Sequence, residues 1–342
     1  MKAIVYTEAG DPSVLQLVER PVPPVAAGQV RVRIAVSGVN PTDWKARQSS
    51  TVVAAGGQVP NQDGAGVVDA VGDNVIGLNV GDRVWVWDAA WQRADGTAQE
   101  YVVLPAHQVV PLPANASFDV GASLGIPALT AHRALTAHHR APVQLEPGAL
   151  RGFTVLVAGG AGVVGHAAIQ LAVWSGATVI ATVSDNEKAE LARRAGAQQI
   201  INYRQEKLVP ALLDRHPAGA DIIVEVNLRA NIESDLELVA SHGTIANYAS
   251  DERDVIPIPT RAGMDKNVRL QYILTYLTEP GAKLASVRAV TAATAAGALE
   301  VGDQAGLPVI RYSLEQTADA HRASQEGVVG KILIDVAPVD NP

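Results

Sequence analysis

The chain contains no cysteine among its 342 residues, and only 4% of them are aromatic. Without cysteine there are no disulfide bonds, no thiolate-bound zinc and no thiol nucleophile. No apolar run is long enough to span a bilayer, and the first residues, MKAIVYTEAG, lack the hydrophobic core of a signal peptide. We therefore expect a cytoplasmic protein that has no membrane partner.

Basic charge is also scarce. The formal net charge is −8, and the lysines and arginines form no cluster in the sequence. Because nucleic acids and anionic membrane surfaces attract basic patches, this balance argues against both as partners. Hydrophobic residues make up 48% of the chain and charged residues 18%, which is typical of a soluble globular protein, and the length suggests two domains.

The most informative stretch covers residues 153–188, FTVLVAGGAGVVGHAAIQLAVWSGATVIATVSDNEK. Its apolar start predicts a buried strand over 153–157, and the following residues predict a helix over 166–174 and a second strand over 178–183. Between the first strand and the helix stands the pattern G-x-G-x-x-G. This pattern is weak evidence alone, but in a strand–turn–helix–strand context it predicts a dinucleotide-binding site rather than an ordinary glycine-rich turn.

Each glycine of the pattern has a physical reason. We expect Gly160 to let the chain leave the strand in a tight turn. Gly162 has no Cβ, so a pyrophosphate can approach the backbone, and Gly165 lets the helix lie close to the sheet. The unpaired N–H groups at the start of the helix would then face the phosphates.

The sequence pattern changes near residue 125, from mostly short strands to alternating strands and helices. Many short strands with glycine and proline between them predict a barrel-like β-domain in the first 125 residues, and regular strand–helix alternation from residue 126 predicts a doubly wound α/β domain. The last strand is expected to return to the first domain, which gives boundaries of 1–125 with 303–342, and 126–302. We expect strands over 1–6, 14–23, 29–36, 64–71, 82–87, 153–157, 178–183, 200–202, 221–226, 244–248, 267–275, 308–312 and 331–336, and helices over 166–174, 188–195, 206–215, 232–240, 285–299 and 314–325.

The chain also resembles a known family over nearly its whole length. The stretches SGVNPTDWKAR, AGVVDAVGDNV, VGDRV, GASLGIPALTAHRAL, the glycine pattern, AGAQQIINYRQE, GADIIVEV and GVVGKILI resemble, in order, the zinc-free branch of the medium-chain dehydrogenase/reductases, and within it the quinone oxidoreductase group that includes zeta-crystallin. The resemblance implies a GroES-like catalytic domain and a Rossmann domain. It also implies NADPH-dependent reduction of quinones or related conjugated carbonyls by a homodimer or homotetramer, and residues 267–275 are apolar enough to form the pairing sheet edge.

No metal is expected. The alcohol dehydrogenase branch carries a Gly-His-Glu motif that supplies a zinc ligand, and the same place here reads Asn61-Gln62-Asp63. With no cysteine either, the usual zinc ligands are missing. His138 and His139 are adjacent, which is not metal-ligand spacing on a helix, so we expect their side chains to diverge into solvent.

The choice between NADPH and NADH depends on the tip of the second strand. The resemblance aligns Ser184 with the position that is acidic in NAD enzymes, Lys188 with a phosphate-binding lysine and Tyr203 with a tyrosine beside the same phosphate. This alignment favours NADPH. Two alternatives remain: a shift of one residue would give the ribose to Asp185 and favour NADH, and Ser184 could instead cap the next helix as part of an S-x-x-E box.

The remaining site residues follow from the resemblance. Asn40, Lys45 and Tyr248 are the candidate catalytic residues, as donors to an acceptor oxygen or as neighbours of the nicotinamide. Each also has a simpler interpretation, such as turn formation at Asn40-Pro41 and core packing for Tyr248. The expected cofactor-binding residues are Asn40, Thr130, Gly160, Ala161, Gly162, Val163, Val164, Gly165, Ser184, Lys188, Tyr203, Asn227, Tyr248 and Lys331.

The acceptor side differs from the quinone oxidoreductases. Lys45 and Thr51 stand where relatives carry two tyrosines, while Trp85, Trp87 and Trp91 gather in WVWDAAWQRADG. These tryptophans would either rebuild an apolar pocket wall or belong to the core. We expect direct hydride transfer to a conjugated acceptor; the alternatives are an enone or enal C=C reductase and a non-catalytic, crystallin-like NADPH-binding protein.

Overall fold

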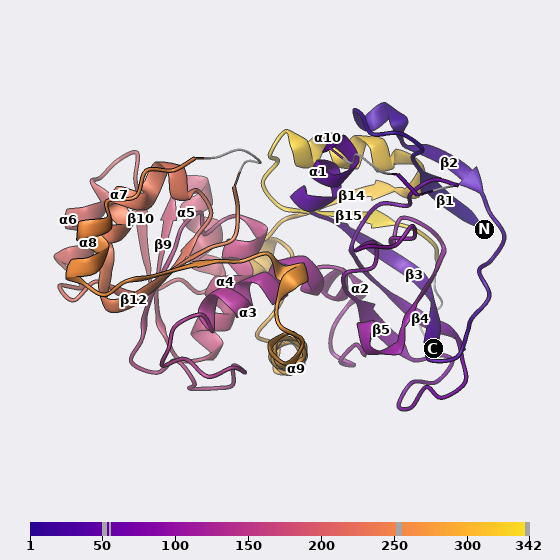
Figure 1. Ribbon diagram of the computed structural model, residues 1–342, viewed down its shortest axis with the longest axis horizontal. Helices are drawn as coiled ribbons and strands as arrows, with labels where there is room; N and C mark the ends of the chain where they lie inside the picture. The colour runs from indigo at the N-terminus through magenta and orange to yellow at the C-terminus, as the bar shows by residue number, and fades with distance from the viewer. Residues whose placement is uncertain (50–52, 55, 251–254, 339–342) are drawn as a thin grey trace. The chain divides into compact units, whose positions relative to one another are not determined.

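The computed structural model of the chain describes residues 1–49, 53–54, 56–250 and 255–338. The chain separates into two compact units, Met1–Ile126 with Pro308–Pro342, and Pro127–Leu307 (Figure 1). From the sequence we placed the second boundary at residues 302 and 303. Residues 303–307 remain with the second unit, where His166 Nε2 donates a 2.8 Å hydrogen bond to the carbonyl of Ala305.

The first unit is built on a mainly antiparallel seven-stranded sheet with the order β14-β15-β3-β4-β5-β7, and β6 also pairs with β3. Alternation in QVRVRI places Val30, Val32 and Ile34 in the core, because successive strand residues point to opposite faces. The last strand pairs antiparallel with β3, which confirms its expected return. The strands are β3 Gln29–Val39, β4 Asp63–Val71, β5 Arg83–Val86, β6 Tyr101–Pro105, β7 Val109–Pro111, β14 Val309–Ser313 and β15 Lys331–Asp335, and β1 Lys2–Val5 pairs with β2 Gln16–Glu19 in a separate sheet.

The helices of this unit are α1 Pro41–Ser49, α2 Phe118–Gly121 and α10 Thr317–Gln325. Helix α1 was not expected, because Asn40-Pro41 suggested only a turn. Proline suits the first position of a helix, where its missing N–H would have no partner. Helix α1 packs against α10, so an element from each end of the chain meets in this unit.

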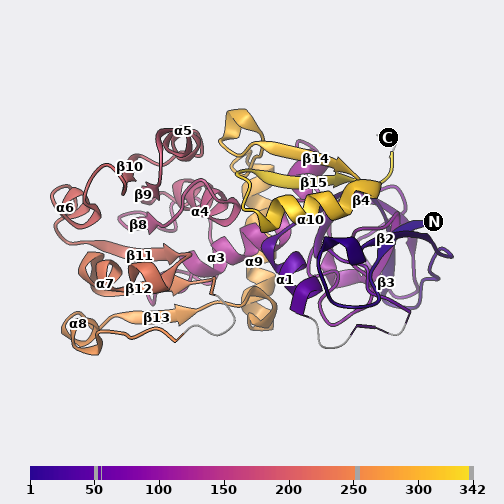
Figure 2. The ribbon, with the colours of Figure 1, turned by 90° about the horizontal axis from the view of Figure 1, so that it is seen from above.

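The second unit is a parallel six-stranded sheet with the order β10-β9-β8-β11-β12-β13 (Figure 2). The chain order reverses between β8 and β11, and ligands bind at such a switch point, beyond the carboxyl ends of the strands. The expected α/β class and doubly wound sheet are confirmed. The elements are β8 Thr154–Val157, β9 Thr178–Val183, β10 Gln199–Asn202, β11 Ala220–Glu225, β12 Val239–Asn247 and β13 Arg269–Tyr272, with α3 Leu129–Leu135, α4 Val163–Trp174, α5 Asn186–Arg194, α6 Leu208–Leu213, α7 Leu228–Leu238, α8 Thr260–Asp265 and α9 Pro280–Ala295.

Both faces of this sheet are covered. Leu156, Ile180 and Ile223 pack with side chains from α6 and α7 on one face, and the alternate residues Val155 and Val179 are fully buried on the other. Burying one such side chain stabilises the fold by about 1.5–3 kcal/mol. The β-branched runs read from the sequence are therefore the core strands that hold the carboxyl ends in line.

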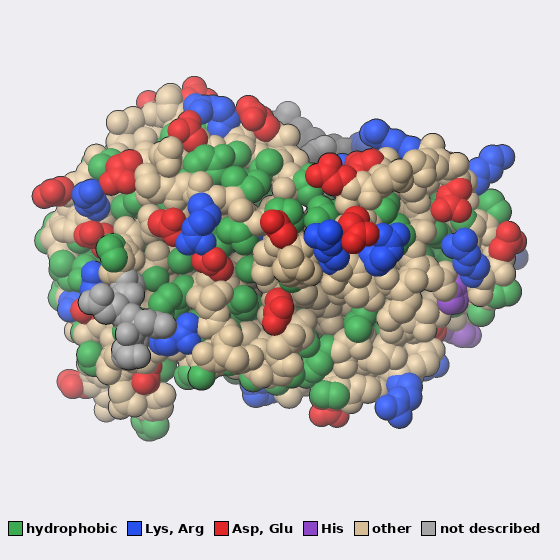
Figure 3. Space-filling model, turned by 180° about the vertical axis from the view of Figure 1, so that it is seen from behind, with side chains coloured by type: hydrophobic (Ala, Val, Ile, Leu, Met, Phe, Trp, Pro, Cys, Tyr) green, Lys and Arg blue, Asp and Glu red, His purple; other side chains and the backbone are tan. Residues whose placement is uncertain are grey.

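Two general surface features can be stated. None of the helices in the described part of the chain is long and apolar enough to cross a membrane. On the face shown in Figure 3, acidic and basic side chains are interspersed, and basic side chains form no extended region there.

Candidate active site

The glycine-rich turn joins β8 to α4. Gly159, which the pattern does not include, takes the left-handed conformation with φ 68°, so the tight turn that we assigned to Gly160 belongs to the residue before it. A Cβ on Gly160 would lie 2.7 Å from the Cβ of Ala181 on β9. A Cβ on Gly165 would lie 2.4 Å from the carbonyl oxygen of Gly159, so the close helix packing expected of Gly165 is present.

Gly162 differs from the other two. It is the N-cap residue of α4 with no side-chain capping bond, and a Cβ placed there would meet only the carbonyl oxygen of Gly159, at 3.3 Å. The backbone is therefore open on this side, next to the first N–H groups of α4. This cradle suits a pyrophosphate group, which is bound by backbone N–H groups at a helix start.

A serine and a lysine meet at the end of β9. Lys188 Nζ donates to Ser184 Oγ at 2.9 Å. Asp185 lies beside them: its Oδ2 accepts from Ser184 Oγ at 2.9 Å and lies 3.3 Å from Lys188 Nζ. Tyr203 is exposed at the end of the neighbouring strand β10, and its N–H donates to Val183 O. The end of β9 thus brings together a cation, a hydroxyl and a carboxylate.

The helix cap at this point is not the one considered from the sequence. Asp185, rather than Ser184, is the N-cap of α5, and its Oδ1 accepts from the N–H of Lys188 at 2.9 Å. This hydrogen bond is the main cause that lowers the pKa of Asp185. The cap engages one oxygen of Asp185 and leaves the Ser184 hydroxyl outside the capping role.

Three further expected residues lie in the second unit. Thr130 is buried on α3. Asn227 caps α7, because its Oδ1 accepts from the N–H of Ala230 at 3.3 Å. Tyr248 follows β12 and its N–H donates to Glu225 O at 3.1 Å. Burial, and after it the charge of Glu225, raises the pKa of Tyr248, so its phenol stays protonated at neutral pH and is able to donate a hydrogen bond.

A pair of buried acids behind this strand end was not expected. Glu225, the last residue of β11, and Asp235 on α7 are both buried. Burial, and after it the charge of Glu225, raises the pKa of Asp235 to about 9. Asn231 Nδ2 donates to both Glu225 oxygens, at 3.0 and 3.2 Å. The side chain of Asp235 therefore carries a proton at neutral pH.

In the first unit, Asn40 belongs to a buried polar cluster that also contains Asp43, Asp63 and Lys331. Lys331 Nζ donates to Asn40 Oδ1 at 3.0 Å and to Val39 O at 3.2 Å. Asn40 Nδ2 donates to Asp63 Oδ2 at 2.8 Å, and the Asn40 N–H donates to Asp43 Oδ2 at 2.7 Å. Every polar group of the Asn40 side chain thus has a charged neighbour.

The cluster's titration follows from its burial. Burial is the largest cause that raises the pKa of Asp43 to about 8, with the charge of Asp63 second. Burial also raises the pKa of Asp63 to about 6, which the nearby Lys331 opposes, and it lowers the pKa of Lys331. At neutral pH Asp63 is therefore largely ionised and Asp43 largely protonated, and the charge of Asp63 favours the ammonium form of the neighbouring Lys331. The sequence did not point to either aspartate, because their burial and the contact of Asp63 with Ile126 depend on the fold.

Comparison with known proteins identifies the family. Residues 26–114 match the family described as alcohol dehydrogenase GroES-like domain, and residues 163–287 match zinc-binding dehydrogenase. The quinone oxidoreductase of Mus musculus is 31% identical over 346 residues, which cover 98% of this chain and 97% of that protein. The chain belongs to the medium-chain dehydrogenase/reductase family. It is a quinone oxidoreductase-like enzyme of that family.

Solved structures of this family agree with the fold. A structure named NAD-dependent alcohol dehydrogenase has a TM-score of 0.84 at 26% identity, covering 98% of this chain and 100% of that one. A mycobacterial protein complexed with NADPH has a TM-score of 0.79 at 28% identity, covering 98% of this chain and 99% of that one. These two names differ in the nicotinamide, so the cofactor has to be argued from the residues of this chain.

Zinc is part of one family description, but the donor set here does not suit a catalytic zinc of this family. Gln62 stands at the histidine position, and its Oε1 accepts from the N–H of Ala90 at 3.0 Å. Asn40 Oδ1 accepts from Lys331. In the part of the chain that the structure describes, no three His, Cys, Asp or Glu side chains lie close enough together to hold a metal. We derive no step through a metal.

The expected acceptor residues have mixed placements. Lys45 is half-buried on α1, with its Nζ 5.7 Å from the ring centroid of Trp44, and Thr51 lies outside the described residues. Trp85 is fully buried in the core of the first unit and offers no face to an acceptor. Trp87 is buried beside His107, with ring centroids 5.9 Å apart, and Trp91 is half-buried.

The expectation that the side chains of His138 and His139 diverge is wrong, and so is the solvated interpretation of His138, whereas His139 is exposed as expected. Their ring centroids are 4.4 Å apart, and His138 is buried, with the ring of Phe153 at 5.2 Å. The two residues lie in a turn rather than a helix, so adjacent side chains can face each other. Burial is the main cause that lowers the pKa of His138 to about 4, and the ring is neutral at pH 7.

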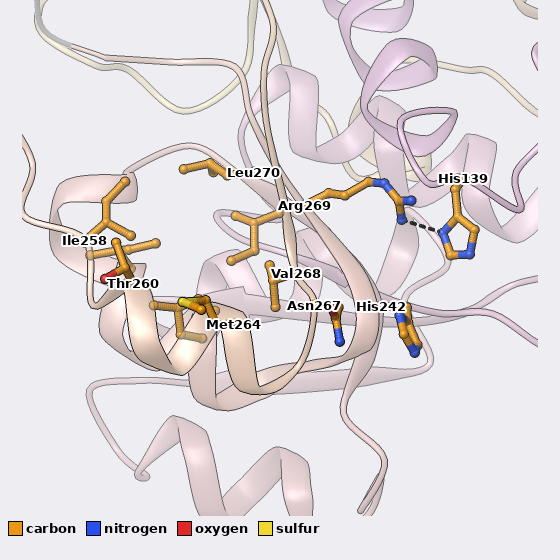
Figure 4. A pocket seen from close by; sticks show the side chains of 13 residues that line it. His139, His242, Ile258, Thr260, Met264, Asn267, Val268, Arg269 and Leu270 are labelled. Carbon is orange, nitrogen blue, oxygen red and sulfur yellow. Dashed lines mark hydrogen bonds between the residues drawn. The ribbon is translucent and has the colours of Figure 1, made fainter.

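A groove of about 630 Å³ lies along α7, α8 and β13 (Figure 4). Arg269 and His139, which share a 2.8 Å hydrogen bond, stand at one end, and Met264 and Leu270 line the apolar part. Among the described residues, its lining includes none of the expected cofactor or catalytic residues. The groove is therefore a feature separate from the candidate active site.

Proposed function

We propose that this chain is an NADPH-dependent oxidoreductase that transfers hydride to a quinone or a related conjugated carbonyl without a metal. The observation that carries the choice of NADPH is the 2.9 Å contact between Lys188 and Ser184 at the end of β9. NAD enzymes of this fold keep an acidic residue there for the ribose 2′-hydroxyl, whereas a cation favours the 2′-phosphate. The mycobacterial relative complexed with NADPH supports the same choice.

Asp185 determines how strongly the site selects NADPH. Its Oδ2 lies within 3.3 Å of Lys188 Nζ, so a bound phosphate has to compete with a carboxylate for the same cation. Its Oδ1 is held by the cap of α5, which keeps the side chain pointing toward its own helix. We infer that Lys188 and Ser184 bind the phosphate and that Asp185 limits the preference over NADH.

In the proposed reaction, bound NADPH supplies the hydride, and a quinone that gains this hydride and a proton leaves as the hydroquinone. The chain's own groups bind and orient the cofactor and the acceptor. Backbone N–H groups at Gly162 and the start of α4 hold the pyrophosphate. The second Nδ2 hydrogen of Asn40, which Asp63 does not take, donates to the acceptor oxygen as negative charge develops there. The protonated phenol of Tyr248 is a second donor of the same kind.

Independence from metal follows from the same argument. An unactivated carbonyl builds alkoxide charge as hydride arrives and needs a strong electrophile, such as zinc, to stabilise it. A conjugated acceptor spreads that charge over its own atoms, so positioning and amide donors suffice. With Gln62 at the histidine position and no cysteine in the chain, we propose that simple alcohols are not substrates.

The partner of the chain is proposed to be a second copy. Strand β13 is the edge of the parallel sheet, and Tyr272, Leu274 and Leu277 are exposed at and after it. An exposed apolar edge strand is a template for pairing with another chain. The cytoplasmic location remains a prediction.

The test is oxidation of NADPH by the purified enzyme with 1,4-benzoquinone, 9,10-phenanthrenequinone or a cyclic enone, and reduction of NADP⁺ with a primary alcohol. We expect turnover with the quinones and none with the alcohol. Enone turnover alone would leave the cofactor assignment in place and identify a C=C reductase. Alcohol oxidation without quinone or enone turnover would refute the proposal, and tight NADPH binding with no turnover would indicate a non-catalytic binding protein.

A further inference from the structure

We propose that Lys331 and Asp63 are positioning residues for Asn40: they fix the orientation of its amide and strengthen its free N–H as a donor, rather than contacting the cofactor themselves. This inference rests on the proposed function, because it concerns how Asn40 meets an acceptor oxygen. From the sequence, Lys331 was expected to bind the cofactor. Its ammonium is instead fully buried and donates to Asn40 Oδ1 and Val39 O.

The chemistry of the two neighbours allows only one amide orientation. An ammonium group has donors only, so the atom 3.0 Å from Lys331 Nζ must be the amide oxygen. An ionised carboxylate has acceptors only, so the atom 2.8 Å from Asp63 Oδ2 must be the amide nitrogen. A flipped amide would place NH₂ against the ammonium and oxygen against the carboxylate. Each charged hydrogen bond is worth roughly ten- to a hundredfold in population, so the flipped state is negligible.

Further hydrogen bonds fix the position of Asp63 and of the Asn40 backbone. Both oxygens of Asp63 lie within hydrogen-bond distance of the Ile126 N–H, at 2.9 and 3.0 Å. The Asn40 N–H donates to Asp43, the first-turn acid of α1. The amide is therefore fixed through its side chain and through its backbone, and it cannot swing away from a developing charge.

The surrounding backbone is shaped for this cluster. A Cβ on Gly38 would lie 2.0 Å from Ala122 O and 3.1 Å from Lys331 Nζ, and a Cβ on Gly125 would lie 2.1 Å from Asp63 Oδ1. Both glycines have ordinary negative φ angles, so their flexibility is not what the fold needs. The Asp63 carboxylate takes the space beside Gly125, and the Ala122 carbonyl with the Lys331 ammonium next to it takes the space beside Gly38, so the absence of a Cβ at both positions leaves room for the two charged groups.

Lys331 and Asp63 also change how strongly the side-chain amide of Asn40 donates a hydrogen bond. A hydrogen bond from a cation to Oδ1 draws electron density away from the nitrogen, which makes the remaining Nδ2 hydrogen a stronger donor. In a buried environment this polarisation is not screened by water. The effect matters most when an acceptor oxygen gains negative charge, so it lowers the barrier to hydride transfer more than it improves binding.

The test is a double-mutant cycle on steady-state NADPH oxidation with a saturating quinone. The variants are Lys331→Met, Asn40→Ala and the two combined. Lys331→Met should lower kcat roughly ten- to a hundredfold and change the KM for NADPH less than about threefold, because one charged hydrogen bond is lost from the positioning of Asn40. If Lys331 acts through Asn40, the combined variant should lose no more kcat than Asn40→Ala alone.

The matched control is Lys283→Met, which removes another buried lysine whose Nζ donates to Thr275 O at 2.9 Å. It should lower thermal stability and leave kcat within about twofold. If Lys331→Met does not fold, as judged by circular dichroism, Lys331→Gln replaces it in the same cycle, because a neutral amide still donates to Asn40 but carries no charge. Additive losses of kcat in the cycle would overturn the inference.

A rise in the KM for NADPH with unchanged kcat in Lys331→Met would also overturn the inference, since it would place the ammonium at the cofactor. These outcomes differ from failure of the proposed function, which would appear as no quinone or enone turnover in the unmodified enzyme. With enone turnover alone, the same cycle is measured on the enone.

Discussion

At the end of β9, a lysine, a serine and an aspartate share hydrogen bonds within 3.3 Å of one another. The sequence identified all three and left open which of Ser184 and Asp185 faces the ribose. The structure narrows the question by giving Asp185 the capping role on α5. We therefore propose that the Lys188 and Ser184 pair, rather than Asp185, binds the nucleotide's 2′-phosphate.

Lys188→Ala should raise the KM for NADPH by roughly ten- to a hundredfold and leave that for NADH nearly unchanged. One charge-assisted contact to phosphate is worth about 1.5–3 kcal/mol. NADH has no 2′-phosphate, so it does not make this contact and its KM does not depend on Lys188. Arg193→Ala, which removes an exposed cation from the same helix, should leave both KM values unchanged. If the unmodified enzyme prefers NADH, Asp185 is the ribose partner and the proposed cofactor is wrong.

Two other residues show what the sequence could not provide. Lys331 fits a family pattern, yet its partners Asn40 and Asp63 come from distant parts of the chain, so only the fold shows that its ammonium is buried. His138 stands next to His139, and helix geometry predicted that they diverge. They lie in a turn instead, where the ring of His138 contacts that of Phe153, and the spacing of the two histidines does not encode that contact.

At the scale of elements, the strands β8, β9 and β11 of the second unit were predictable because each is a run of mostly β-branched or apolar residues that is almost wholly buried. Helix α1 was missed because its sequence, PTDWKARQS, is polar, and its buried residues Asp43 and Arg47 are charged. Their burial depends on neighbours elsewhere in the chain, such as the Gly10 carbonyl that accepts from Arg47. Helix α8 was missed as well, and none of its residues is fully buried.

The turn between β8 and α4 predicts opposite outcomes for two similar substitutions. Gly165→Ala should lower the melting temperature, because its Cβ would lie 2.4 Å from Gly159 O. Gly162→Ala should leave the melting temperature nearly unchanged and weaken NADPH binding roughly tenfold or more, because its Cβ would fill the open side of the cradle. Thermal unfolding and fluorescence titration with NADPH measure both. Equal NADPH affinity in Gly162→Ala and the unmodified enzyme would show that the pyrophosphate does not lie there.

The packing of α7 on β11 gives a prediction about stability and pH. The pKa of Asp235 is raised from 3.8 to about 9, so the folded state holds its proton more tightly than the unfolded state. This group's stability contribution is greatest below about pH 4 and is lost as pH rises toward 9. Asp235→Asn has no proton to lose and can still donate to Glu225.

Asp235→Asn should therefore increase the free energy of unfolding by about 1–3 kcal/mol at pH 7, and the gain should shrink toward pH 4. Urea unfolding at several pH values measures it. The control Asp214→Asn, at an exposed aspartate, should change nothing. A destabilised Asp235→Asn variant at pH 7 would mean that the carboxylate is needed in its charged form.

At the scale of the whole molecule, we propose that copies of the chain pair through the edge strand β13. The N–H of Ile273 donates to Asn247 on β12, so in a parallel ladder the N–H of Tyr272 points away from β12. Tyr272→Lys places a charge on the exposed edge and should convert a dimer or tetramer to smaller species without lowering the melting temperature. Light scattering coupled to size exclusion measures it. An unchanged mass would show that another surface joins the copies.

The most direct measurement of the central claim is NADPH oxidation by enzyme treated with a strong chelator, with 9,10-phenanthrenequinone as acceptor and NADH compared in the same assay. We predict that activity survives the chelator, because amide donors rather than a metal stabilise the acceptor. We also predict that kcat/KM is higher with NADPH than with NADH, because Lys188 binds the 2′-phosphate. Loss of activity that added zinc restores, or no quinone reduction with either nicotinamide, would contradict it.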